Sequence, residues 1–179
     1  MTRWLFLFGR KRLLKKIDID KDNKVRILDI GCGTGYSLKY LEKKYPNAEL
    51  IGVDLSPEMI KKAKKKSNNL NLILDKYSLD LFAEGEFDLI IASYSLTIIN
   101  NQTESLRAIN HHLKIGGTLA IVDFDYTKFS FYDSFMKWSN VFIDKELYIN
   151  LQSIFINKFN YSGKSMYGLW HYFIFIGQK

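Results

Sequence analysis

The stretch that most constrains the fold of this chain covers residues 25–35, Val-Arg-Ile-Leu-Asp-Ile-Gly-Cys-Gly-Thr-Gly. An apolar run carries an acid, Asp29, and leads into glycines at alternate positions, Gly31, Gly33 and Gly35. Glycine lacks a Cβ and tolerates positive φ, so such a turn lets the backbone come very close to a flat, polar or anionic ligand. The stretch therefore predicts a buried strand that ends in a ligand-binding turn.

A second acid stands where a ligand that contains a ribose needs one. The next apolar run, residues 48–54, ends at Asp54, about 20 residues after the glycines, and in Rossmann-like units an acid at this distance bonds the ribose hydroxyls. One carboxylate suits this task because it accepts two hydrogen bonds. Ser56 and Pro57 then match a helix N-cap and first helical residue. The dinucleotide fingerprint G-x-G-x-x-G fails, because its third glycine falls on Tyr36.

Length and composition predict one domain over residues 1–179 in a reducing cytoplasm. The chain has 179 residues, of which 47% are hydrophobic, which is ample for one core. Its single cysteine, Cys32, excludes a disulfide framework. The three histidines lack ligand spacing, so we expect no metal site. His111 and His112 fall in a predicted helix and are expected at the surface or at an edge.

The N-terminal segment, residues 1–20, is basic and amphipathic. Its apolar part, residues 4–8, precedes its charges and is too short for a signal peptide or a membrane span. Two functions fit it: a lid over the ligand site, or peripheral contact with an anionic membrane at its inner face. The net charge of +7 also draws on lysines in residues 61–66, which form a solvated helix face. Without a basic-aromatic repeat, this charge does not favour a nucleic-acid partner.

Apolar and amphipathic segments alternate along the rest of the chain. Strands are predicted over residues 25–30, 49–53, 70–75, 87–93 and 118–124, and helices over 34–44, 57–66 and 103–113. A helical stretch over residues 130–157 precedes two segments, 161–167 and 171–176, that predict a hairpin. Continuous apolar strands between helices indicate a parallel sheet buried on both faces.

The glycine spacing, with its acid two residues ahead, resembles motif I of the class I S-adenosylmethionine-dependent methyltransferases. Residues 87–96, Phe-Asp-Leu-Ile-Ile-Ala-Ser-Tyr-Ser-Leu, resemble that family's strand-four motif. Residues 113–119 resemble its L-K-P-G-G-x-L turn, with Ile115 in place of proline. The resemblance covers residues 24–125 and the hairpin extends it. It implies a Rossmann-like, mostly parallel seven-stranded sheet in the order 3-2-1-4-5-7-6, with an antiparallel final hairpin and helices on both faces.

The same resemblance implies a cofactor, S-adenosyl-L-methionine, with S-adenosyl-L-homocysteine as product. Asp29 is expected to face the amino group of its methionine portion, and Asp54 its ribose. Leu55 and Met59 are expected to flank adenine, whose exocyclic amine Asp75 and the backbone of Lys76 would bind, although Asp80 competes for this role. The predicted cofactor-binding residues are Asp29, Gly31, Cys32, Gly33, Gly35, Asp54, Leu55, Met59, Asp75, Lys76 and Ser93.

Methyl transfer is an in-line displacement, so the protein must orient the acceptor and exclude water. An amine acceptor attacks only when neutral, so a nearby group must take or relay a proton. Tyr94 and Asp123 are the predicted acceptor-side residues, because each follows or ends a central strand. Asp125 is a further acid at that end. Aromatic faces for a methylated ammonium are predicted at Tyr94, Phe124, Trp170 and Tyr172.

A narrower resemblance concerns the acceptor. Residues 6–14, Phe-Leu-Phe-Gly-Arg-Lys-Arg-Leu-Leu, look like the F-x-x-G-R-x-x-L entry of bacterial lipid N-methyltransferases, and residues 122–124 match their V-D-F. This resemblance implies N-methylation of a phospholipid or betaine-lipid headgroup. The alternatives are a soluble small-molecule acceptor, a non-catalytic cofactor-binding domain, and an RNA or protein methyltransferase. The N-P-P-Y tetrapeptide of many nucleic-acid methylases is absent after strand four.

Overall fold

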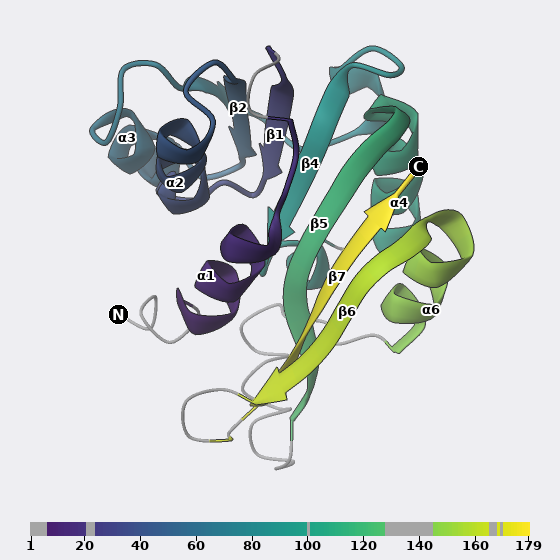
Figure 1. The fold of residues 1–179 in the computed structure, drawn as a ribbon. Helices are drawn as coiled ribbons and strands as arrows, with labels where there is room; N and C mark the ends of the chain where they lie inside the picture. The colour runs from purple at the N-terminus through teal and green to yellow at the C-terminus, as the bar shows by residue number, and fades with distance from the viewer. Residues whose placement is uncertain (1–6, 21–23, 100, 128–144, 165–167, 169) are drawn as a thin grey trace.

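Apolar runs form the strands of one mixed sheet, and helices cover both of its faces (Figure 1). The computed structural model describes residues 7–20, 24–99, 101–127, 145–164, 168 and 170–179. The strands are β1 Arg26–Ile30, β2 Glu49–Asp54, β3 Asn71–Leu74, β4 Phe87–Ser93, β5 Leu113–Thr127, β6 Ile156–Lys164 and β7 Trp170–Gln178. The α-helices are α1 Leu7–Lys16, α2 Tyr36–Lys44, α3 Pro57–Lys64, α4 Gln102–His112 and α6 Lys145–Ile154, with short 3-10 helices at η1 Leu79–Leu81 and η2 Leu96–Ile98.

The sheet has seven strands in the order β3-β2-β1-β4-β5-β7-β6. Neighbouring strands from β3 to β5 are parallel, whereas β7 runs antiparallel to both β5 and β6. The predicted fold class and strand order are confirmed. The strand order reverses between β1 and β4. In open sheets of this kind, ligands bind at the carboxyl ends of the strands beside such a reversal.

Alternate residues of the central strands supply two cores, because successive side chains point to opposite faces of a sheet. Ile27 belongs to the core beneath α1 and α2, where Leu13 is fully buried. Its neighbour Leu28 belongs to the core beneath α4 and α6, together with Leu106 and Leu151. The sheet is thus covered on both faces, as the continuous apolar strands predicted.

The two faces are visible in Figure 1, where α1 and α2 lie on one side of the central strands and α4 lies behind them. Helix α3 begins as predicted, with the Ser56 side chain accepting a hydrogen bond from the Met59 amide and Pro57 in the first turn. Helix α2 begins later than predicted, because Gly35 adopts a left-handed conformation at its N-cap.

The C-terminal part departs most from prediction. Helix α6 ends at Ile154 and β6 begins at Ile156, so a helix that continues to residue 157 is wrong. Within the part of the chain that the structure describes, strand β6 pairs with β7 alone, and it is exposed along most of its length. An edge strand needs no continuous apolar run, which is why its polar residues concealed it. The predicted helix over residues 130–144 lies outside the described residues.

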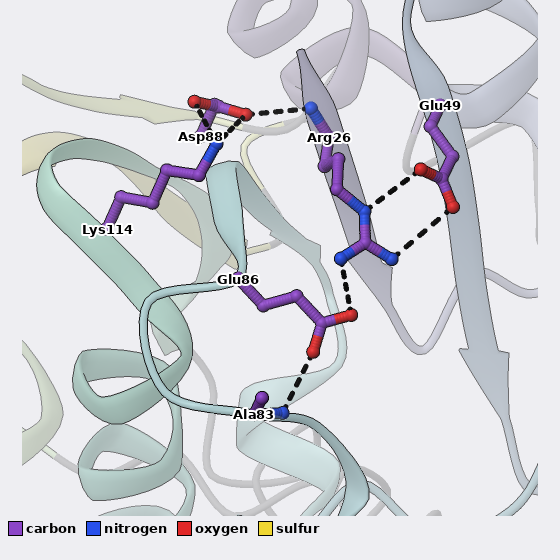
Figure 2. A network of polar contacts seen from close by, with 6 residues as sticks. All are labelled: Arg26, Glu49, Ala83, Glu86, Asp88 and Lys114. Atoms are coloured by element: carbon purple, nitrogen blue, oxygen red, sulfur yellow. Dashed lines mark hydrogen bonds and ion pairs between the residues drawn. The ribbon is translucent and has the colours of Figure 1, made fainter.

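A network of ion pairs connects neighbouring strands near their N-terminal ends (Figure 2). Arg26 donates from Nε to Glu49 at 3.0 Å and from Nη1 to Glu86 at 2.6 Å. Its backbone amide donates to Asp88 at 2.8 Å, and Lys114 also pairs with Asp88 at 2.8 Å. These side chains are partly exposed, so each pair stabilises the fold modestly. The network favours the β2-β1-β4-β5 register.

His112 is fully buried at the end of α4, so its expected surface position is wrong. Its Nδ1 lies 2.9 Å from the Tyr77 hydroxyl and its Nε2 lies 2.9 Å from the Leu79 carbonyl. Burial lowers the pKa of the imidazole, so the neutral form is favoured. The side chain joins α4 to the loop after β3.

Candidate functional site

The glycine turn has the backbone shape that its composition predicted. Gly31 and Gly33 have φ of 66° and 55°, values that residues other than glycine rarely adopt. A Cβ on Gly31 would lie 2.6 Å from that of Ser95, so this glycine permits a close approach between loops. Among the described residues, a Cβ on Gly33 would meet one atom, the Gly31 carbonyl oxygen at 4.0 Å, so these residues leave space open above it.

Asp54 holds the turn in place. Its Oδ2 accepts a hydrogen bond from the Gly33 amide at 2.7 Å, and its Oδ1 accepts one from the Ser56 amide at 2.9 Å. Each carboxylate oxygen has a second lone pair. Asp54 can therefore fix the turn and still accept hydrogen bonds from ligand hydroxyls.

A cavity of about 710 Å³ opens at the carboxyl edge of the sheet, beside this turn. Of the predicted residues, Gly31, Gly33, Asp54, Leu55, Met59, Asp75, Lys76, Ser93 and Tyr94 line it. Residues that the sequence did not single out also line it, among them Arg10, Thr34, Tyr77, Ser95, Asn101 and Glu104. The cavity thus joins the glycine turn to η2, the start of α4 and one residue of α1.

Two predicted residues of the turn face away from the cavity. Cys32 is buried against Gly52, where an added Cβ would lie 2.9 Å from its Sγ. Burial raises the pKa of this thiol, so it stays neutral. Gly35 packs against α3, where an added Cβ would lie 3.1 Å from the Cβ of Ala63. Neither lines the cavity, so both belong to the support of the turn rather than to the predicted ligand contacts.

Asp29 lies behind the lining residues. Its side chain is 1% exposed, and neither carboxylate oxygen has a hydrogen-bond partner among the described residues. Burial raises the pKa of this carboxyl to about 7, with the Asp54 charge adding to the rise and the Arg10 charge opposing it. Such a group is costly in the folded protein unless something pairs with it.

Ser93 and Arg10 meet at the cavity wall. The Ser93 hydroxyl is buried and has no hydrogen-bond partner among the described residues. Its carbonyl accepts a hydrogen bond from Arg10 Nη2 at 3.3 Å. Arg10 comes from α1, and the spacing of apolar residues in that helix did not reveal which charged residue points inward.

The two residues predicted to bind adenine lie at one side of the cavity. Asp75 and Lys76 are exposed lining residues, and the Lys76 amide donates to Asp75 Oδ1 at 2.6 Å. The Lys76 amide is thus hydrogen-bonded to its neighbouring side chain. Tyr77, which the sequence analysis did not single out, is buried and presents an aromatic wall there.

Tyr94 lines the cavity in an unusual backbone conformation, with φ of 56°. Its amide donates to the Val122 carbonyl at 2.8 Å, and its ring packs on Phe124. A Cβ on Gly9 would collide with its hydroxyl, so α1 lies directly against it. Burial, reinforced by the Asp123 charge, raises the pKa of this phenol, so it acts as a neutral hydrogen-bonding group.

Asp123 does not line the cavity, so its predicted place beside the acceptor is wrong. It is fully buried and accepts hydrogen bonds from the Leu96 amide at 2.9 Å, from the Thr97 amide at 3.2 Å and hydroxyl at 2.6 Å, and from the Phe124 amide at 2.9 Å. Burial nonetheless raises the pKa of this carboxyl to about 6. Asp123 anchors η2, the loop that follows Tyr94.

The predicted aromatic cage also does not form at the cavity. Of its four members only Tyr94 lines it, whereas Phe124, Trp170 and Tyr172 are buried in the core beneath α1. Asp125 lines a smaller cavity of about 270 Å³ near β6, where it accepts a hydrogen bond from Ser162. These side chains are packing residues.

Helix α1 packs its apolar side on the protein itself. Leu13 and Leu14 are fully buried, whereas Lys11, Lys15 and Lys16 are exposed. Phe8 remains 63% exposed. No helix within the described ranges is long and apolar enough to cross a membrane. Helix α1 thus lies over the sheet with Arg10 in the cavity wall, and whether it acts as a lid stays a prediction.

Comparison with known proteins places the chain in a family. The sequence profile described as "Methyltransferase domain" matches residues 27–117. A malonyl-[acyl-carrier protein] O-methyltransferase of Acetivibrio thermocellus is 32% identical over 121 residues, which cover 66% of this chain and 42% of that protein. A ribosomal RNA small subunit methyltransferase C of Haemophilus influenzae is 33% identical over 123 residues, covering 64% and 36%. The chain thus spans less than half the length of these relatives.

Solved structures share the fold. The YcgJ protein of Bacillus subtilis superposes with a TM-score of 0.73 at 14% identity, covering 97% of this chain and 98% of that chain. Geranyl diphosphate C-methyltransferase of Streptomyces coelicolor, solved with S-adenosyl-L-homocysteine, has a TM-score of 0.80 at 12% identity, covering 96% and 80%. Neither of the two sequence relatives named above is a lipid N-methyltransferase by name, so that narrower resemblance gains no support from them.

The family profile covers the glycine turn, Asp54 and the strands that form the cavity edge. The predicted cofactor, S-adenosylmethionine, agrees with this match. With the strand order and the turn geometry, it shows that the chain belongs to the methyltransferase domain family, with the class I S-adenosylmethionine-dependent fold that its motifs indicated.

Proposed function

We propose that this chain transfers a methyl group from S-adenosylmethionine to a small acceptor that enters the cavity beside Tyr94. The observation that carries the proposal is the set of unsatisfied groups around the glycine turn. The space above Gly33 is open, and the buried Asp29 carboxylate and Ser93 hydroxyl lack hydrogen-bond partners among the residues described. Because buried polar groups are normally paired, these residues fit a ligand that carries an ammonium group and hydrogen-bonding oxygens.

Each part of the cofactor is assigned to residues of complementary chemistry. Asp54 would hold the ribose hydroxyls with its remaining lone pairs, and Asp29 the ammonium group. Leu55, Met59 and Tyr77 would enclose the adenine. Asp75 would contact its exocyclic amine. When bound, the cofactor supplies a methyl group on a positively charged sulfur, which is both the electrophile and its leaving group.

The chain's own residues then have to orient the acceptor and exclude water. Tyr94 projects from the end of β4, beneath α1, and its neutral phenol can donate or accept one hydrogen bond. Asp123 acts indirectly, since it fixes the η2 loop that follows Tyr94. Asn101 and Glu104 line the side of the cavity formed by the start of α4. Glu104 is the carboxylate on that side of the cavity, where it could pair with a cationic acceptor.

We infer an amine as the acceptor, because Glu104 offers a cationic group an anionic partner at that side of the cavity. A lipid headgroup receives less support than a soluble amine. Two apolar residues of α1, Leu13 and Leu14, are buried against the sheet and so are not available to a membrane, whereas Phe8 is exposed. A carboxylate acceptor is the second candidate, because several relatives are named malonyl-[acyl-carrier protein] O-methyltransferases.

Calorimetric titration tests the cofactor part of the proposal. The wild-type protein should bind S-adenosylhomocysteine, and Asp54→Ala should weaken this binding by about 100-fold, as expected for the loss of two hydrogen bonds to a charged group. Asp80→Ala is the matched control, because Asp80 is an exposed acid outside the cavity lining. Absence of binding by the wild type, or equal binding by Asp54→Ala, would remove the proposal.

The acceptor is tested by transfer of a labelled methyl group into three separate pools. They are a mixture of soluble amines, malonyl-acyl carrier protein, and vesicles that contain phosphatidylethanolamine. We expect label in the amines. Label in malonyl-acyl carrier protein instead would establish the carboxylate alternative, and label in the vesicles would establish the lipid headgroup. Cofactor binding without label in any pool would favour the binding-domain alternative.

A further inference from the structure

Arg10 is the charged residue of α1 that reaches the cofactor cavity. It lines the cavity, and its Nη2 donates to the Ser93 carbonyl across 83 positions of sequence. Its positive charge opposes the rise in the pKa of Asp29, a buried residue of strand β1. Arg10 thus lies in the cavity wall next to the glycine turn, and the Asp29 carboxyl lies enclosed behind that wall.

The Ser93 hydroxyl lies in the same region. Ser93 on β4 and Asp29 on β1 belong to adjacent strands, in which Asp29 is opposite Ile91 and Ser93 follows two positions later. Because alternate residues share a face, both side chains point to the α1 side of the sheet. Both are buried without a hydrogen-bond partner among the described residues. The cavity wall therefore offers the Arg10 guanidinium and the Ser93 hydroxyl to a small polar group, and the Asp29 carboxyl is enclosed behind them.

An amino-acid head carries the complementary set, an ammonium and a carboxylate on one carbon. Guanidinium groups are suited to carboxylates because their N–H donors match both carboxylate oxygens. We propose that Arg10 binds the carboxylate of the cofactor's methionine portion and is a specificity-determining residue of this site, an inference that rests on the proposed function. Helix α1 would then be held over the cavity more firmly when the cofactor is bound.

The packing around Arg10 favours this role. Gly9, the preceding residue, lies directly against Tyr94, Val122 and Tyr172, so the helix cannot shift outward without opening that contact. Leu13 and Leu14 anchor the following turn in the core. Arg10 therefore projects from a fixed backbone, which lowers the entropy lost when its side chain binds a ligand.

A series of three ligands separates this role from a general effect of α1. S-adenosylhomocysteine carries both the ammonium and the carboxylate, its decarboxylated analogue keeps only the ammonium, and 5′-methylthioadenosine lacks both. Calorimetry gives the ratio of affinities for the first two ligands. In the wild type this ratio should be about 10 to 100, the range for one charge-assisted hydrogen-bonded pair. In Arg10→Gln it should fall close to one, while the affinity for 5′-methylthioadenosine stays within about threefold of wild type.

Lys11→Gln is the matched control, since it removes the same charge from an adjacent, exposed position of the same helix. It should keep the wild-type ratio, and Arg10→Lys should give an intermediate one. If the wild type binds S-adenosylhomocysteine and its decarboxylated analogue with nearly equal affinity, the proposal is overturned without any variant. It is also overturned if folded Arg10→Gln keeps the wild-type ratio of affinities, because Arg10 would then only connect α1 to β4. If the wild type binds none of the three ligands, the proposed function itself fails.

Discussion

Replacement of Asp29 by asparagine should stabilise the ligand-free protein while it weakens cofactor binding. Asp29 is fully enclosed and its carboxylate has no hydrogen-bond partner among the described residues. Burial raises the pKa of this group from 3.8 to about 7. The folded protein therefore binds a proton at Asp29 more tightly than the unfolded chain does. Between these two pKa values, the free energy of unfolding falls as the pH rises.

The size of the effect follows from this change in pKa. One pH unit corresponds to about 1.4 kcal/mol, so ionised Asp29 costs the folded state about 4 kcal/mol above pH 7, relative to pH 4. Asparagine has a similar shape and no charge, so it lacks this cost. The stability advantage of Asp29→Asn over wild type should be small at pH 4, grow between pH 4 and pH 7, and level off above pH 8. Asp123 titrates in both proteins, so its contribution cancels in the difference.

Urea unfolding of both proteins at pH 5, 6, 7 and 8 measures this difference directly. Titration with S-adenosylhomocysteine at pH 8 should show that the variant binds at least about tenfold more weakly, because its neutral amide replaces the partner of the ammonium group. Together these results would show that the Asp29 carboxylate serves ligand binding and lowers the free energy of unfolding. A stability difference that stays constant from pH 5 to pH 8 would refute the reasoning.

Three further substitutions distinguish residues that stabilise the fold from residues that contact the ligand. Asp123→Ala should lower the free energy of unfolding by about 3 kcal/mol, because it leaves several buried donors around η2 unpaired; a loss below about 1 kcal/mol in urea unfolding would contradict its anchoring role. Gly33→Ala should weaken S-adenosylhomocysteine binding by about tenfold in calorimetry, because its Cβ would enter open ligand space and its φ of 55° is strained for alanine. Arg26→Ala should cost about 1 kcal/mol in urea unfolding without changing ligand affinity, because its ion pairs are partly exposed and distant from the cavity; a weakened affinity would show coupling between the two edges of the sheet.

The fold and part of the cavity lining could be predicted from local pattern. The glycine turn and the acid Asp54 were recognisable because their spacing along the chain is short, and the structure brings Asp54 to the turn as a hydrogen-bond acceptor. The central strands were recognisable because parallel strands buried on both faces are continuously apolar. The edge strand β6 lacked that signal, and its start at Ile156 was missed.

The acceptor side depended on which face of the sheet each residue occupies. Ser93 is opposite Val122, so Asp123, one position further, points to the other face. The same alternation places Asp123 beneath η2 and away from the cavity, although it lies near the end of the apolar run of β5 as predicted. Strand pairing sets this parity, and a single sequence does not contain it.

The sequence by itself determined the fold class, the ligand-binding turn and the two acids that flank it, because these depend on periodicity and on spacings within one β-α-β unit. Only the tertiary structure decided that Arg10 reaches the cavity, because its contact with Ser93 joins positions 83 residues apart. It also decided that Asp29 is enclosed without a hydrogen-bond partner among the described residues. Burial and charge pairing arise from the packing of α1 on the sheet, a long-range arrangement that no local pattern encodes.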